Sequence, residues 1–298
     1  ERVVIDGERY VLKHISFTDD WLMRASSDLT GREVILWESG LLHSLPPSID
    51  HATVGAARYD SPDGPRAALL MNDVGPWLVP EGDAKLPLEQ HLHFLDHMAE
   101  LHAWFWEWTD TVGLMPLAKR YLLLHPDVEL SEAALGSEEP IPKLIGEGWR
   151  LLPNRAPRTA KIVLPLLTDL RPFLKAVEAT PQTLLIGDWK ATNLGTEPDG
   201  RTILLDRAFP GVGPACSELA WYLAINTDRL PHSKEDTIEA YRISLERHGI
   251  RTEPWWETQL SLALLGAVIQ FGWQKVLGGD KELGWWEEMA NRGARYLT

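Results

Sequence analysis

One loop and the strand that follows it constrain this chain more than any other feature. Residues 187–193 read Gly-Asp-Trp-Lys-Ala-Thr-Asn, and the apolar run at residues 202–205 ends at Asp206. An Asp and an Asn five residues apart on one loop can reach a common point, and an Asp at a strand end can reach it too. The sequence therefore predicts that Asp188, Asn193 and Asp206 bring three oxygen-bearing side chains to one site.

Such a trio suits the transfer of a phosphoryl group. Catalysis of this reaction depends on positioning and on neutralising charge over the phosphate oxygens. Asn193 and Asp206 are predicted to hold Mg²⁺, which prefers oxygen ligands and usually takes only one or two protein carboxylates. Asp188 is predicted to accept or orient the proton of a hydroxyl nucleophile. Lys190, two residues further on, is expected to lie alongside the γ-phosphate.

The order of several segments carries a family resemblance. The pattern Gly-Asp-x-x-x-x-Asn, followed by a strand and an Asp, resembles the catalytic and metal-binding loops of the aminoglycoside phosphotransferase and choline kinase family, relatives of the protein kinases. Other segments of that family are matched in the same order, over nearly the whole chain, by Val11–Lys13, Glu33, Leu69–Val74, Ala99–Ala103 and Gly213–Ala220.

The resemblance implies an α+β, two-lobed protein-kinase-like fold. Residues 1–73 are expected to form a nucleotide-binding N-lobe, a small antiparallel β-sheet with one helix. Residues 74–298 are expected to form a mainly helical C-lobe that carries the catalytic loop, the metal loop and the acceptor-binding helices. ATP is expected in the cleft between the lobes.

The resemblance also assigns residues to nucleotide binding. Lys13 is expected to point at the α- and β-phosphates and Val11 to cover the adenine. Glu33 is expected to form an ion pair with Lys13, and Glu38 is the alternative partner. The backbone of the segment that joins the lobes is expected to contact adenine, through Asn72 and Val74.

Four features depart from the family pattern. Glu218 replaces an expected Asp, which is a smaller change. Ile186 stands where the family usually has His, so the sequence does not show which residue supports the catalytic loop. Arg207 stands where a bulky residue is common, and its guanidinium either contacts a phosphate or screens the neighbouring carboxylates. No Gly-rich loop precedes Lys13. Because residues 2–13 read as a hairpin around Asp-Gly, we expect the first strand and the Gly-rich loop upstream of residue 1.

Periodicity and turn signals predict the remaining elements. A helix is expected over residues 28–45, and a long helix is expected to bury one stripe made of Leu88, Leu92, Leu95, Ala99, His102 and Trp106. Residues 131–157 are expected to be loop and short helix. Further helices are expected over residues 164–179, 217–226, 234–248, 254–277 and 283–296.

Composition limits the partners. A net charge of −14 repels a phosphate backbone and so disfavours nucleic acid, whereas it favours approach of a cation. One cysteine excludes an internal disulfide and indicates a reducing compartment. The longest apolar stretch, residues 260–271, is too short to span a bilayer. We therefore expect a cytoplasmic protein without a membrane partner.

The sequence thus favours an ATP- and Mg²⁺-dependent small-molecule kinase. Its acceptor is expected to be the hydroxyl of an amine-bearing molecule, an aminoglycoside or a related amino sugar or amino alcohol. Choline, homoserine and a sugar are alternative acceptors. A catalytically silent nucleotide-binding protein and a metal-dependent hydrolase, in which Asp188 and Asp206 hold ions for attack by water, remain as alternatives from other classes.

Overall fold

A computed structural model describes residues 1–16, 18–62 and 64–297. Phe17, Asp63 and Thr298, which belong to the two predicted lobes, lie outside the described residues. The chain divides into two compact units. The first unit comprises Glu1–Met115, Thr183–Val212 and Trp221–Thr252, and the second comprises Pro116–Gln182, Gly213–Ala220 and Glu253–Thr298.

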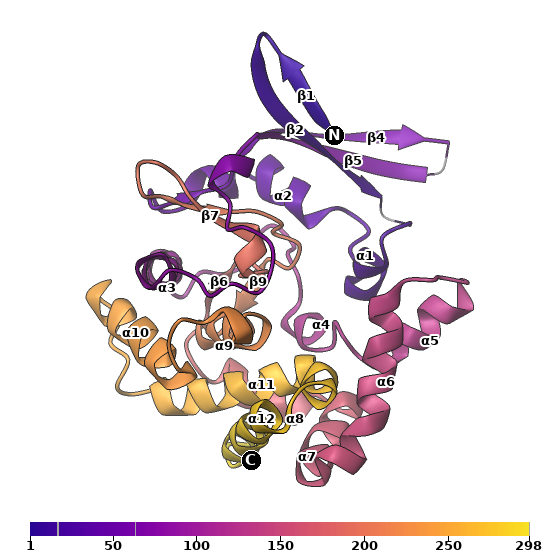
Figure 1. The fold of residues 1–298 in the computed structure, drawn as a ribbon, viewed down its shortest axis with the longest axis vertical. Coiled ribbons are helices and arrows are strands. Elements are labelled where there is room, and N and C mark those ends of the chain that lie inside the picture. The colour runs from indigo at the N-terminus through magenta and orange to yellow at the C-terminus, as the bar shows by residue number, and fades with distance from the viewer. Residues whose placement is uncertain (17, 63, 298) are drawn as a thin grey trace. The chain divides into compact units, whose positions relative to one another are not determined.

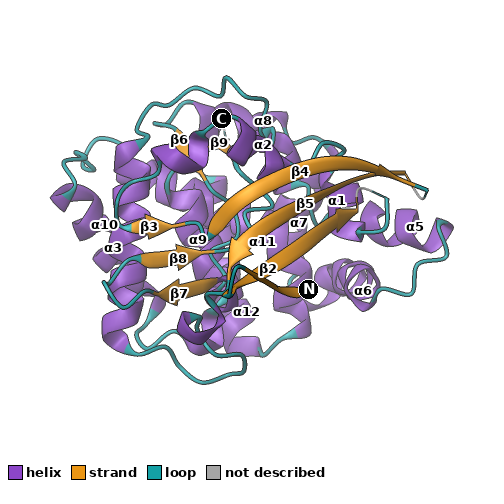
Figure 2. Cartoon of the chain, turned by 90° about the horizontal axis from the view of Figure 1, so that it is seen from above, coloured by secondary structure: helices purple, strands orange, loops and turns teal. Residues whose placement is uncertain are grey.

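The first unit contains a four-stranded antiparallel sheet (Figures 1 and 2). Its order is β1-β2-β5-β4, with β1 (Arg2–Ile5), β2 (Glu8–Ser16), β4 (Thr53–Ser61) and β5 (Gly64–Asn72). The predicted hairpin is confirmed: Asp6 and Gly7 adopt φ values of 52° and 86°, as a tight two-residue turn requires.

One face of this sheet packs on α2 (Arg32–Glu38), which follows the short helix α1 (Trp21–Ser26). Val34 of α2 forms a buried cluster with Ile15, Ala67 and Leu69 of the strands. The helix predicted over residues 28–45 is wrong in its extent. Gly31 and Gly40, with φ of 70° and 76°, interrupt it before and after α2, and residues Leu41–Ser44 form a separate 3₁₀ turn.

The rest of the first unit consists of short strands and two long helices. They are β3 (Ile49–Asp50), β6 (Thr183–Leu185), β7 (Leu194–Thr196), β8 (Thr202–Leu204), α3 (Leu88–Trp104) and α10 (Lys234–Arg247). Strands β3, β8 and β7 form one sheet, and β6 pairs with β9 (Gly211–Gly213). The first residues of helix α9 (Cys216–Ile225), up to Ala220, belong to the second unit, and its residues from Trp221 onward belong to the first.

The buried stripe predicted on α3 is correct only in part. Leu95, Ala99 and His102 are fully buried, whereas Leu88 and Leu92 are 45% and 38% exposed. The first turns of α3 instead bury His91 and Phe94, so the core face there is offset from the predicted stripe.

The second unit is helical. Its helices are α4 (Leu117–Tyr121), α5 (Asp127–Ala134), α6 (Pro140–Arg155), α7 (Pro157–Thr168), α8 (Arg171–Glu178), α11 (Trp256–Leu277) and α12 (Asp280–Ala294). The single helix predicted over residues 164–179 is wrong: it is two helices, and Pro172 lies in the first turn of α8, where its missing N–H costs no hydrogen bond.

The loop and short helix predicted over residues 131–157 are also wrong in extent, because most of this range forms the long helix α6. Its glycines permit close packing rather than turns. A Cβ at Gly148 would lie 2.1 Å from the carbonyl oxygen of Trp273 in α11, so only glycine allows the two helices to approach at this point. The prolines near its start occupy first-turn positions.

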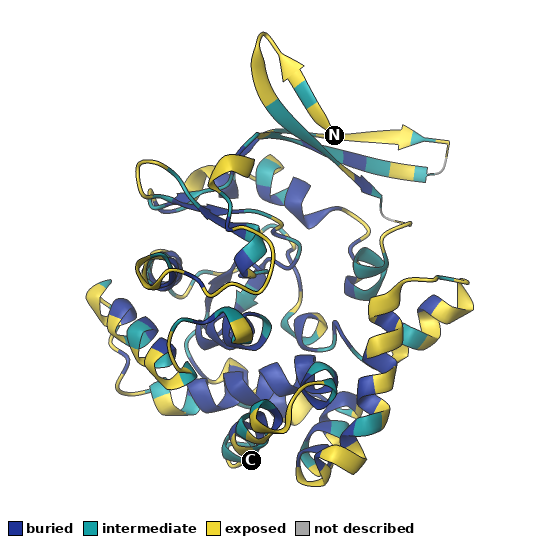
Figure 3. Cartoon of the chain, viewed as in Figure 1, coloured by how far each residue is buried: buried dark blue, intermediate teal, exposed yellow. Residues whose placement is uncertain are grey.

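Helix α11 is the core helix of the second unit. Among the described residues it is the one helix that is long and apolar enough to cross a membrane, but 89% of that apolar window is buried inside the protein. Figure 3 shows it almost entirely in the colour of buried residues. Its apolar residues pack against α6, α8 and α12 of the same unit.

Candidate active site

The loop after β6 brings Asp188 and Asn193 together, as the sequence predicts. Asn193 Nδ2 donates to Asp188 Oδ2 at 2.9 Å, and the indole Nε1 of Trp221 donates to Asp188 Oδ1 at 2.7 Å. Both oxygens of the carboxylate are therefore held, one from its own loop and one from α9. Two donors on one carboxylate restrict its rotation.

Gly187 lets this loop pack closely on the segment that follows Asp206. Its φ is 131°, and a Cβ there would lie 3.0 Å from the backbone nitrogen of Phe209. A side chain at this position would be strained and would separate the two segments. The glycine thus lets the loop of Asp188 lie against the backbone of Phe209.

The pKa of Asp188 reflects this arrangement. Burial raises it from 3.8 to about 6, and the negative charge of Asp206 contributes in the same direction. The hydrogen bonds from Trp221 and Asn193 and the charge of Lys190 oppose the rise. A carboxylate with a pKa near 6 is ionised at neutral pH and is a stronger proton acceptor than an ordinary Asp.

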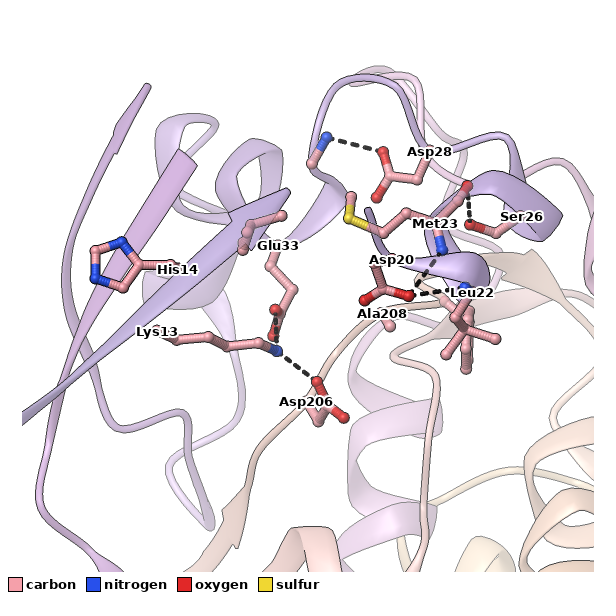
Figure 4. A pocket seen from close by; sticks show the side chains of 13 residues that line it. Lys13, His14, Asp20, Leu22, Met23, Ser26, Asp28, Glu33, Asp206 and Ala208 are labelled. Atoms are coloured by element: carbon pink, nitrogen blue, oxygen red, sulfur yellow. Dashed lines mark hydrogen bonds and ion pairs between the residues drawn. The ribbon is translucent and has the colours of Figure 1, made fainter. Parts of the chain in front are cut away.

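On the sheet side, Lys13 lies between two carboxylates (Figure 4). Its Nζ is 2.7 Å from Glu33 Oε2 and 2.5 Å from Asp206 Oδ1. Burial by itself lowers the pKa of Lys13, but the two negative charges outweigh it and raise the pKa above its ordinary value. Glu38, the alternative partner, instead pairs with Arg58 at 3.1 Å.

The positive charge of Arg207 acts on Asp206 and Glu33, so Arg207 screens the neighbouring carboxylates, which is one of the two roles left open for it. Its buried guanidinium donates to the carbonyl oxygens of His51, at 3.0 Å, and of Leu204, and to Thr53 Oγ1 at 2.8 Å. Its backbone N–H donates to Glu33 Oε1 at 3.0 Å. The residue therefore ties the segment after β8 to the residues that precede β4.

Two oxygens remain open for a metal. Asn193 Oδ1 and Asp206 Oδ2 accept no hydrogen bond from the described part of the chain. Asp206 also adopts φ 54°, a conformation that is uncommon for non-glycine residues but is more frequent for Asp than for most others. One carboxylate and one amide oxygen suit Mg²⁺, which takes its other ligands from phosphates and water.

The structure gives the contacts of the other predicted residues, which are Lys190, Val11, Asn72 and Val74. Lys190 is exposed, and its charge acts on both Asp188 and Asp206. Val11 pairs with Met71 in the sheet. The backbone N–H groups of Asn72 and Val74 donate to the carbonyl oxygens of Ala52 and Asn72, so their contact with adenine stays a prediction.

Two residues that hold the catalytic loop, Trp221 and Asn226, were not predicted from the sequence. Trp221 bonds to Asp188, and Asn226 accepts from the N–H of Ala191 at 2.7 Å and donates to the carbonyl oxygen of Trp189 at 2.9 Å. Both belong to the segment after Gly213–Ala220. A Trp and an Asn near a helix end carry no signal of this role in one sequence.

Comparison with known proteins supports the fold. No protein-family model matches the chain, and no curated protein matches it in sequence. The structure of a microcompartment-associated aminopropanol kinase matches with a TM-score of 0.53 and 12% identity, covering 97% of this chain and 85% of that one.

Two further solved structures give similar alignments. Choline kinase from Streptococcus pneumoniae matches with a TM-score of 0.48 and 11% identity, covering 99% of this chain and 88% of that one. The GDP complex of aminoglycoside 2'-phosphotransferase-IIIa matches with a TM-score of 0.49 and 13% identity, covering 99% and 88%. On the likeness to the aminopropanol kinase, the chain has the α+β protein-kinase-like fold that the sequence predicts.

Proposed function

We propose that this protein is a kinase that transfers the γ-phosphoryl group of ATP to the hydroxyl of a small, amine-bearing molecule. The observation that carries the proposal is the Asp188 carboxylate, held at both oxygens and influenced by the charge of Asp206, in the same unit as the Lys13–Glu33 ion pair. The likeness to a protein named as an aminopropanol kinase supports an amino alcohol or a related acceptor.

In the proposed reaction Asp188 acts on the acceptor. Its carboxylate accepts the proton of the acceptor hydroxyl as that oxygen bonds to the γ-phosphorus. The bond between the γ-phosphorus and the oxygen that bridges it to the β-phosphate breaks, and ADP leaves with that oxygen. The products are a phosphate monoester, ADP and the proton on Asp188, which returns to solvent.

The cationic side chains act on the phosphates. Lys13, held by Glu33, binds the α- and β-phosphates, and Lys190 lies beside the γ-phosphate. Asn193 and Asp206 would hold Mg²⁺, which would neutralise charge on the phosphate oxygens. Val11, Asn72 and Val74 are proposed to line the adenine site.

The test is an acceptor screen of the wild-type protein, with the Asp188→Asn variant measured in parallel. Conversion of ATP to ADP and the mass of the phosphorylated acceptor are measured over amino alcohols, amino sugars, aminoglycosides, choline, homoserine and neutral sugars. Asp188→Asn is expected to reduce kcat roughly 100- to 10,000-fold, the range of general base catalysis. Its affinity for Mg·ATP, measured by calorimetry, is expected to change little.

The screen also distinguishes the kinase from the silent nucleotide-binding protein and from the hydrolase. Asp199→Asn, at an exposed carboxylate that pairs with Arg201, is the control and should keep full activity. Binding of Mg·ATP without transfer to any acceptor would establish the silent nucleotide-binding protein instead. Phosphate release without an acceptor, unaffected by Lys13→Ala, would establish the hydrolase. Full activity of Asp188→Asn would remove Asp188 from the mechanism.

A further inference from the structure

The residue before the catalytic loop provides no hydrogen bond to it. Ile186 is fully buried and aliphatic, so its side chain has neither a donor nor an acceptor. The carboxylate of Asp188 and the backbone of the loop must therefore be supported from elsewhere. The structure shows this support on α9 and the residue after it.

Two side chains from that segment reach the loop. The indole N–H of Trp221 donates to Asp188 Oδ1 at 2.7 Å, and the amide of Asn226 bonds to the backbone of Trp189 and Ala191. Asn226 thus fixes the path of the loop, whereas Trp221 fixes the side chain of Asp188. Trp221 is the donor with a direct effect on the reacting group.

The indole is itself held rigidly. Trp221 is 3% exposed, and its ring packs on Phe209 with centroids 5.7 Å apart and planes at 49°. Phe209 in turn lies in the segment that Gly187 contacts. An indole fixed by packing loses little freedom when it donates to a carboxylate, so the contact orients Asp188 at low entropic cost.

Asn193, the second donor to Asp188, cannot fix the orientation of the carboxylate alone. Asn193 Nδ2 donates to Oδ2, but the same amide is proposed to turn its oxygen to the metal. With Trp221 in place, the carboxylate is held at Oδ1 as well, and each oxygen keeps a lone pair for the acceptor hydroxyl. Without Trp221 the carboxylate can rotate about the bond that joins it to its side chain.

We propose that Trp221 is a positioning residue for the transfer step, whose indole N–H holds Asp188 in the orientation that accepts the proton. This inference rests on the proposed kinase function. Trp221 does not touch the nucleotide in this proposal, so its loss changes turnover rather than Mg·ATP affinity.

Three variants test the inference. Trp221→Phe keeps an aromatic ring and removes the N–H, and it is expected to lower kcat roughly 10- to 100-fold, as the loss of a hydrogen bond to a charged group does. The KM for Mg·ATP is expected to stay within about twofold. Trp221→His places Nε2 at nearly the same distance from Cβ as the indole nitrogen and should recover part of the lost kcat.

Trp273→Phe is the matched control. Trp273 is buried in α11, and its indole N–H has no hydrogen-bond partner among the described residues. The same Trp-to-Phe change there is expected to leave kcat and KM unchanged. Equal kcat values for the Trp221→Phe variant and the wild type would overturn the inference, as would equal loss of kcat in the Trp221→Phe and Trp221→His variants.

A spectroscopic readout separates this inference from the kinase proposal. The indole ¹H–¹⁵N resonance of Trp221, assigned by its absence in Trp221→Phe, is expected to move upfield in Asp188→Asn, because a neutral amide is a weaker acceptor than a carboxylate. A resonance that does not move would overturn the contact, whether or not the protein phosphorylates any acceptor. Absence of transfer in the wild type, with a resonance that moves, would instead reject the kinase proposal.

Discussion

The carboxylate of Glu33 accepts a hydrogen bond from the backbone N–H of Arg207 at 3.0 Å. Its other oxygen pairs with the Lys13 ammonium at 2.7 Å. One side chain of α2 thus connects a strand of the sheet to the segment that follows β8. The position of Lys13 and that of the residue after Asp206 therefore depend on the same carboxylate.

We predict that Glu33→Gln weakens nucleotide binding. The variant keeps the size of the side chain but removes the charge that fixes Lys13, and Lys13 then remains paired with Asp206 alone. A hydrogen bond between charged groups contributes about 1.5–3 kcal/mol, so the KM for Mg·ATP is expected to rise roughly 10- to 100-fold. Steady-state kinetics at saturating acceptor measure the change.

Glu38→Gln is the control for this prediction. Glu38 lies on the same helix and pairs with Arg58 on the exposed face of the unit. Exposed ion pairs contribute about 0–1 kcal/mol, and this one does not contact Lys13, so KM should remain near the wild-type value. An equal rise in KM for both variants would contradict the assigned partner of Lys13.

The second prediction concerns stability. Arg207→Met keeps the length of the side chain but removes a donor from the carbonyl oxygens of His51 and Leu204 and from the hydroxyl oxygen of Thr53. The carbonyl oxygen of His51 and the hydroxyl of Thr53 remain bonded to each other. A buried polar group that loses its partner costs about 1–3 kcal/mol, partly offset here because a buried charge is also removed. We expect the free energy of unfolding in urea to fall by about 1–3 kcal/mol.

Arg201→Met provides the comparison. Arg201 lies on the same β7–β8 hairpin, but it is 40% exposed and pairs with Asp50 and Asp199 at the surface. Its loss is expected to change the free energy of unfolding by about 1 kcal/mol or less. If the two variants unfold at the same urea concentration, the bonds of the Arg207 guanidinium do not stabilise the fold.

The sequence predicted the elements whose signal is local. The hairpin around Asp6 and Gly7 follows from a turn that requires positive φ, and α10 and α11 follow from long periodic or apolar runs. It failed where glycine or proline had another purpose. Gly148 serves close packing of α6 on α11, and Pro172 begins a helix instead of interrupting one. Composition alone does not distinguish a glycine in a turn from one at a helix contact.

In the candidate site, too, the sequence predicted the residues that carry a local signal and missed the others. Asp188 and Asn193 lie on one short loop, so their spacing predicted their contact. The meeting of Asp206 with them stays a prediction, supported by the effect of its charge on Asp188. The ion pair of Lys13 with Glu33 came from the order of segments in a family resemblance. The contact of Trp221 with Asp188 and the bonds of the Arg207 guanidinium to His51 and Thr53 were not predicted, because each joins residues that are far apart in the sequence. Such contacts appear only in three dimensions.

The third prediction concerns pH and a buried histidine of the first unit. His91 is fully buried on α3, where its ring nitrogens lie 2.9 Å from the hydroxyl of Tyr222 and 3.3 Å from that of Thr237. Burial lowers the pKa of His91 from 6.5 to about 4, and the nearby His232 contributes in the same direction. The folded state therefore favours the neutral ring, whereas the unfolded chain takes up the proton near its ordinary pKa.

The sign of the effect follows from these two pKa values. The contribution of His91 to stability is fully present above pH 6.5 and is lost as the pH falls from 6.5 towards 4. At pH 4.5 the loss amounts to roughly 2–3 kcal/mol. His91→Gln retains a donor and an acceptor but cannot titrate, so its free energy of unfolding should fall less between pH 7 and pH 4.5 than that of the wild type. Because the comparison is made over pH, the packing cost of the substitution cancels.

His14→Gln, on the exposed face of β2, is the control. Urea unfolding at the two pH values measures the difference, and identical losses in the His91→Gln variant and the wild type would show that His91 is not a source of acid sensitivity.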